Sequence, residues 1–138
     1  MRNIKTHKVE QLIMAAVAFF WCFLLWFSSA AFVPTIASKF DLGVKGVALL
    51  ASSAIWTAPI ARPLAGWAAD RFGAPKAFVL ILVVCGAFSI LSAYAETLGP
   101  ALGMTEYHFL FWARVVVATA GISFVVGIQH VAQWFESE

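Results

Sequence analysis

The sequence predicts an all-α membrane protein with four transmembrane helices, and three observations support this fold class. The chain is 62% hydrophobic and only 12% charged, with a mean hydropathy of +0.89, whereas a soluble domain carries about 25% charged residues. Four apolar runs each approach or exceed the about 20 residues of helix that cross a bilayer core. The runs are continuous and lack the alternation of β-barrel strands. Because lipid offers the backbone no hydrogen-bond partner, the runs must be helical.

The four predicted spans cover residues 12–37, 46–69, 77–95 and 108–135. Residues 1–11 are a predicted cytoplasmic tail, and residues 136–138 are the start of a cytoplasmic loop, so we expect a truncated chain. The first span has about 26 residues, which is too long for a signal-peptide core of about 7–15. The connections at 38–45, 70–76 and 96–107 are short and contain turn-forming glycine or proline. Consecutive spans should therefore be antiparallel neighbours.

Basic residues are distributed unequally between the two sides of the predicted bundle. Five lie on the side of the N-terminus: Arg2, Lys5, Lys8, Arg71 and Lys76. Only Lys39 and Lys45 lie in connections on the opposite side. Because loops rich in lysine and arginine stay in the cytoplasm, we expect a multi-pass protein of the bacterial inner membrane with a cytoplasmic N-terminus.

Several other classes of function are not favoured by the sequence. The net charge of +2 is spread without a long basic cluster, which argues against nucleic-acid binding. Cys22 and Cys85 lie in separate apolar runs and are expected to be buried thiols, not a disulfide. His108 and His130 lie at opposite ends of one span, so they do not form the facing pair that a haem requires. We find no catalytic triad, metal cluster or phosphate loop, and expect no enzyme activity, cofactor or metal.

Arg62 lies inside the second span, where an arginine costs about 2.5–3.5 kcal/mol on insertion scales. Pro59 and Pro63 flank it, and each removes a backbone donor from the helix. Ala65 and Gly66 leave room beside it for a close approach. A planar guanidinium binds oxyanions with two donors, so Arg62 is a candidate anion-binding residue. Alternatively, Arg62 snorkels to the cytoplasmic headgroups, about 10 Å away along the helix.

Arg114 is a second intramembrane charge, about six residues inside the fourth span. Ala118 and Gly121 share its helix face and form a narrow stripe for close helix packing. One interpretation gives Arg114 a functional role in a central cavity. The other has it snorkel outward or pair with a carboxylate such as Glu106.

A motif of glycine and charged residues closes the second span: Gly66, Asp70, Arg71 and Gly73. Its spacing resembles the signature loop of the major facilitator superfamily, although Ala74 and Pro75 stand where that family usually has basic residues. Arg114 is similar to the intramembrane arginine that this family carries in its fourth helix. The resemblance implies that the four motif residues act in a cytoplasmic gate between two halves of a transporter.

Three further segments resemble the nitrate/nitrite porter branch of that superfamily: Trp26-Phe27-Ser28 with Pro34, Gly121-Ile122-Ser123-Phe124, and Gln133-Trp134-Phe135. Arg62 matches the second-helix arginine that is implicated in oxyanion binding there. The resemblance implies a twelve-helix fold, of which this chain would be the N-terminal third, with inverted three-helix repeats.

The resemblance also implies a function. The expected activity is secondary active transport of a small inorganic anion, nitrate or nitrite, by alternating access. The expected partners are the lipid bilayer, the anion, a coupling proton or counter-anion, and the missing C-terminal helices. Two alternatives stay open: a major facilitator protein for another solute or for the magnetosome membrane, and a non-transporting polytopic membrane subunit.

Overall fold

The computed structural model describes residues 2–135, apart from the side chains of residues 2–6, 29 and 58. Within that range the chain forms helices and no strand, which confirms the all-α prediction. The elements follow in the order α1 (Arg2–Ala31), α2 (Val33–Lys39), α3 (Val44–Trp56), α4 (Ala58–Phe72), α5 (Ala74–Ser92), α6 (Ala95–Ala101), α7 (Glu106–Val117), the 3-10 helix η1 (Ala118–Ile122) and α8 (Ser123–Phe135).

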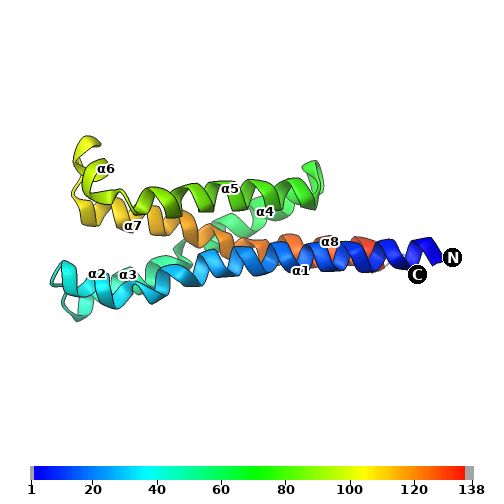
Figure 1. Cartoon of the computed structure of the whole chain (residues 1–138), viewed down its shortest axis with the longest axis horizontal. Coiled ribbons are helices and arrows are strands. Elements are labelled where there is room, and N and C mark those ends of the chain that lie inside the picture. Colours follow the sequence, from blue (N-terminus) through cyan, green and yellow to red (C-terminus); the bar gives the residue numbers. More distant parts are fainter. Residues whose placement is uncertain (1, 136–138) are drawn as a thin grey trace.

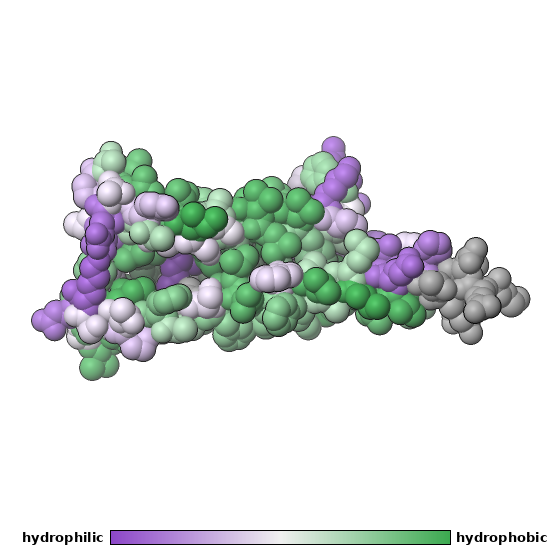
Figure 2. All heavy atoms as spheres, in the orientation of Figure 1, coloured by the Kyte–Doolittle hydropathy of each residue, from purple (hydrophilic) through white to green (hydrophobic). Residues whose placement is uncertain are grey.

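These elements combine into four candidate membrane spans, the number that the sequence predicts: His7–Lys39, Val44–Phe72, Ala74–Ser92 and Glu106–Phe135. The start of α1, the end of α8 and the α4–α5 turn lie toward one end of the bundle, and the α2–α3 turn and α6 lie at the other (Figure 1). We call these the inner and the outer end, after the predicted orientation. Figure 2 shows apolar residues over the middle of the visible face and hydrophilic residues at both ends. This distribution is what a bilayer requires.

Three of the four spans are interrupted part-way along. The first is interrupted at Phe32, between α1 and α2, and the second at Thr57, between α3 and α4. In both cases a proline occupies the first turn of the helix that follows. Proline lacks the N–H that would continue the preceding helix, and it suits a helix start. In the fourth span, η1 replaces about one turn of α-helix near Gly121.

Two glycines permit the turns that reverse the chain. Gly73 has φ +87° between α4 and α5, and Gly103 has φ +71° between α6 and α7. Side chains other than glycine rarely adopt such angles. Part of the predicted connection at 96–107 is itself helical, because α6 covers Ala95–Ala101.

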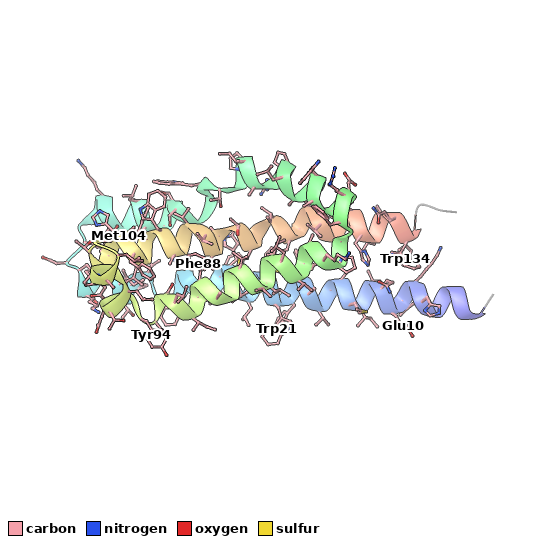
Figure 3. All side chains as sticks on the ribbon, turned by 90° about the horizontal axis from the view of Figure 1, so that it is seen from above. Glu10, Trp21, Phe88, Tyr94, Met104 and Trp134 are labelled. Atoms are coloured by element: carbon pink, nitrogen blue, oxygen red, sulfur yellow. The ribbon has the colours of Figure 1, made fainter. Side chains whose placement is uncertain are left out.

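The core lies where α1, α4, α5, η1 and α8 meet, and small side chains dominate it. Cys22 and Cys85 are 0% exposed and free, as expected for buried thiols. Ala120 and Val126 are likewise 0% exposed. Small residues let helix backbones approach closely in lipid. Many large apolar side chains instead remain on the surface, and the labelled Trp21 and Tyr94 point away from the helices in Figure 3.

Candidate functional site

Arg62 lies in the second turn of α4, with an exposed side chain. It precedes Phe72 by ten residues, about 15 Å of helix at 1.5 Å per residue. This distance to the helix end is longer than the about 10 Å to the membrane edge expected from the sequence, because α4 continues past Ala69 to Phe72. No hydrogen bond or ion pair to another described residue occupies the guanidinium. The position therefore offers an exposed cation whose donors no described residue occupies.

Trp26 holds the helices together at the depth where the second span is interrupted. Its indole Nε1 donates to the carbonyl of Ala54 on α3, 3.2 Å away. Ala54 is one of the last four residues of α3, whose carbonyls lack the usual helical partner. The indole also lies against Gly121 of η1, where a Cβ would come within 3.2 Å of the ring. Trp26 thus connects α1, α3 and η1, and fixes the point from which α4 starts toward Arg62.

The four residues of the loop motif lie together at the inner end of α4. Asp70 accepts a hydrogen bond from Gln129 Nε2 on α8. The Arg71 guanidinium stacks over the Trp67 ring, 5.7 Å from its centroid. Gly66 faces α8, since a Cβ there would be 4.0 Å from Val125. Asp70 and Arg71 therefore have separate partners, and the carboxylate fastens the second span to the fourth.

Sequence reasoning did not identify Gln129 as the partner of Asp70. The signal that could have found it is an uncharged polar residue near the inner end of the fourth span, at the depth of the motif. The next residue, His130, is 8% exposed, and its Nε2 is 3.1 Å from Gln11 Oε1 on α1. Consequently α8 has polar contacts with both α4 and α1 at this end.

Arg114 is buried in α7, with 6% of its surface exposed. Its Nε donates to the carbonyl oxygen of Leu50 on α3 at 3.0 Å. This burial contradicts the interpretation in which Arg114 snorkels outward, whereas its pairing with a carboxylate such as Glu106 stays a prediction. Leu50 lies twelve residues before Arg62, about 18 Å along the second span. The two arginines thus belong to different regions of the bundle.

Glu106 is part of a charged cluster at the outer end, which sequence reasoning also missed. Lys39 Nζ contacts Glu96 Oε1 at 2.6 Å and Glu106 Oε1 at 2.5 Å. The hydrogen bond from Lys39 lowers the pKa of the Glu96 carboxyl below its ordinary value. The cluster connects α2 to α6 and α7. Its signal in the sequence is the 96–107 connection, which has acidic residues and no basic one, opposite a lysine at the end of the first span.

Residues 14–138 match the family model described as the Major Facilitator Superfamily, which covers almost the whole chain. The chain belongs to the Major Facilitator Superfamily. This membership confirms the expected fold class, in which the four spans are an N-terminal fragment of the superfamily's fold. It also identifies a multi-pass membrane protein from a family of transporters rather than of enzymes. No group of three or more His, Cys, Asp or Glu side chains that could hold a metal occurs in the described part of this superfamily member.

The curated relatives of this superfamily member confirm the resemblance to the nitrate/nitrite porter branch. The chain is 29% identical over 119 residues to a nitrate/nitrite transporter NrtP of Nostoc punctiforme, covering 86% of this chain and 22% of the relative. It is 27% identical to an NrtP of Picosynechococcus, covering 88% and 21%. It is 30% identical to a probable nitrate/nitrite antiporter NarK1 of Thermus thermophilus, covering 83% and 27%. The chain thus spans about a quarter of these relatives' length. No solved structure gives a significant match.

Proposed function

We propose that the protein containing this chain is a secondary transporter of a small oxyanion, nitrate or nitrite, in the bacterial inner membrane. The anion would bind at Arg62, and alternating access would carry it across. The observation that carries the proposal is the exposed Arg62 guanidinium, about 15 Å inside the span and unoccupied by any described side chain. The relatives whose names include nitrate and nitrite supply the substrate class.

The environment of Arg62 supports an anion site in physical terms. Its planar fork can give an oxyanion two parallel donors, and such charge-assisted bonds are about twice as strong as neutral ones. The helix start at Ala58 and the internal Pro63 loosen the backbone around it. An intramembrane arginine is costly, so it is a functional-site hypothesis by default.

The loop motif of Gly66, Asp70, Arg71 and Gly73 provides a surface whose contacts change during alternating access. The bond between Asp70 and Gln129 holds α4 against α8 within this half of the protein. Arg71, which stacks on Trp67, leaves a positive charge at the same edge. In the proposed mechanism, this edge contacts the remaining helices in one of the two conformations and separates from them in the other.

The test is Arg62→Lys in the protein that contains this chain, with uptake of labelled nitrate and nitrite measured at matched expression. Lysine keeps the charge but loses the planar donors, so affinity should fall about tenfold or more, the equivalent of one lost charge-assisted bond of about 1.5–3 kcal/mol. Arg2→Lys in the predicted tail is the matched control and should leave uptake unchanged. Wild-type affinity in Arg62→Lys would contradict the site. A wild type that moves neither anion would contradict the substrate class.

A further inference from the structure

The inner end of α8 carries two neighbouring polar side chains that contact different helices. Gln129 Nε2 donates to Asp70 on α4, and His130 Nε2 lies 3.1 Å from Gln11 Oε1 on α1. Figure 3 shows these parts of α1 and α8 at the end of the bundle that Trp134 marks. His130 has only 8% of its surface exposed. The proposed transport site does not use this buried, titratable side chain.

The rest of the contact between α1 and α8, which we call the α1–α8 seam, is mainly apolar. A groove of about 430 Å³ lies between the two helices, and its walls contain no polar side chain. Further along the seam, the rings of Phe19 and Phe124 have centroids 5.9 Å apart. Apolar walls cannot solvate a charge. The protonation state of His130 therefore bears directly on whether the seam stays closed.

The hydrogen bond to Gln11 fits the neutral form of the His130 ring. An amide oxygen can only accept, so Nε2 donates to it and Nδ1 carries no proton. An imidazolium has a donor on both nitrogens, but no second hydrogen bond or ion pair joins the ring to a described residue. Gln129 Oε1 is a buried acceptor without a described partner, yet adjacent residues on a helix do not face each other.

Charged side chains on α1 do not provide a counter-ion for His130. His7 and Glu10 pair with each other at 3.2 Å, and their side chains are 65% and 58% exposed. Lys8 lies over the Phe135 ring, 5.7 Å from its centroid, and its charge has the same sign as an imidazolium. Apart from His130, α8 and the adjoining η1 carry no titratable or charged residue.

The other helices that pack against α8 do not provide a counter-ion either. On α4, Asp70 is held by Gln129, and Arg71 stacks on Trp67. On α5, Lys76 is exposed and positive. The side chains of four more charged residues lie outside the described ones: Arg2, Lys5, Glu136 and Glu138. Within the described part of the chain, an imidazolium in the closed seam would thus be a buried charge without an ion pair.

We propose that His130 is a proton-binding site at the inner end of the bundle, and that binding the proton releases α8 from α1. The proton comes from water on the inner side and is held at Nδ1. A buried charge without a partner is costly, so the imidazolium favours a conformation in which the separated helices admit water. By linkage, opening the seam also strengthens proton binding. The inference does not depend on the solute that Arg62 would bind.

The test measures access to the seam at different pH values in the protein that contains this chain, in vesicles whose predicted cytoplasmic side faces out. Ala15→Cys places a thiol in the seam, about one turn from Gln11, where the side chain is 7% exposed. Val9→Cys, at a residue that is 53% exposed, is the reference, because thiol reactivity itself depends on pH. The native cysteines are 0% exposed, so a membrane-impermeant maleimide should give low background labelling.

The rate at Ala15→Cys relative to that at Val9→Cys should rise at least about fivefold from about pH 8 to about pH 5, the range in which histidine changes charge, since couplings of this kind typically shift an equilibrium about 5- to 150-fold. His130→Gln keeps a donor for Gln11 but cannot be protonated, so the rise should vanish. In Gln11→Glu a carboxylate faces the imidazolium, so the rise should vanish or reverse. His7→Gln is the matched control and should leave the rise intact.

Four results would overturn the inference. They are a constant ratio in the wild-type background, the same rise in His130→Gln, an undiminished rise in Gln11→Glu, and loss of the rise in His7→Gln. The last result would assign the proton to the exposed pair of His7 and Glu10. The assay contains no transported solute. A protein that shows the expected rise but moves neither nitrate nor nitrite would therefore support His130 while contradicting the proposed function.

Discussion

The contact between Trp26 and Gly121 allows a sharp prediction for the substitution Gly121→Ala. A Cβ added at Gly121 would lie 3.2 Å from Cε2 of the indole and 3.3 Å from Cδ2 and Cζ2. The ring must then shift by a few tenths of an ångström. That shift is opposed by the hydrogen bond from the indole Nε1 to Ala54, which is already 3.2 Å long.

The expected magnitude combines three effects. Overpacking costs about 1–3 kcal/mol, and loss of the indole hydrogen bond costs about 0.5–1.5 kcal/mol. Alanine favours a helix over glycine by about 1 kcal/mol, which offsets part of the loss. We therefore expect Gly121→Ala to lower the free energy of unfolding by about 0.5–3.5 kcal/mol.

Gly86 on α5 is a matched control, since a Cβ there would meet nothing within 4 Å. Gly86→Ala should leave stability unchanged or raise it by up to about 1 kcal/mol. Both variants can be compared with the wild type by detergent-induced unfolding in mixed micelles, followed by circular dichroism. If Gly121→Ala proves as stable as Gly86→Ala, the indole does not pack against η1 as the structure describes.

Two further predictions concern the inner motif and the orientation. Asp70→Asn should reduce transport and leave membrane insertion near normal. The amide weakens the charge-assisted hydrogen bond from Gln129, and such bonds typically contribute about 1.5–3 kcal/mol. Unchanged uptake by a well-expressed variant would contradict a role in gating. A thiol introduced at Thr97 should react with a membrane-impermeant reagent from outside and one at Ala74 should not, and the reverse pattern would invert the predicted topology.

The sequence predicts the number of spans, because each span needs a long apolar run to cross the lipid. Hydropathy, however, locates the membrane boundary and not the end of the helix. The predicted second span stops at Ala69, before the first charge. In the structure α4 continues through Asp70 and Arg71 to Phe72, because charged residues at the interface can remain helical. Gly73 ends the helix with φ +87°. This extension adds three residues to the distance between Arg62 and the end of its helix, and leaves the predicted membrane boundary where it was.

The interruptions of the spans differ in how far they can be predicted. Pro34 and Pro59 are local causes, and a proline in an apolar run already indicates a break. The 3-10 segment η1 has a tertiary cause, since Gly121 accepts the face of an indole from another helix. Glycine lowers helix propensity at that position, but the sequence does not show which side chain uses the space.

Long-range partners are the least predictable part of the candidate site. The sequence indicates an ion pair between Arg114 and a carboxylate such as Glu106, because opposite charges on one span attract each other. In the structure, Glu106 contacts Lys39, and Arg114 donates a hydrogen bond to the carbonyl of Leu50. The same carbonyl also accepts from the Ser53 hydroxyl at 2.6 Å. Every helical residue carries a carbonyl, so no pattern of side chains identifies this acceptor.

The Leu50 carbonyl orients the guanidinium of Arg114, because the hydrogen bond is donated by its Nε. Both outer carboxylates, Glu96 and Glu106, are held by Lys39 at the outer end of the bundle. For Arg62, the Arg→Lys comparison separates the contribution of planar donors from that of charge alone.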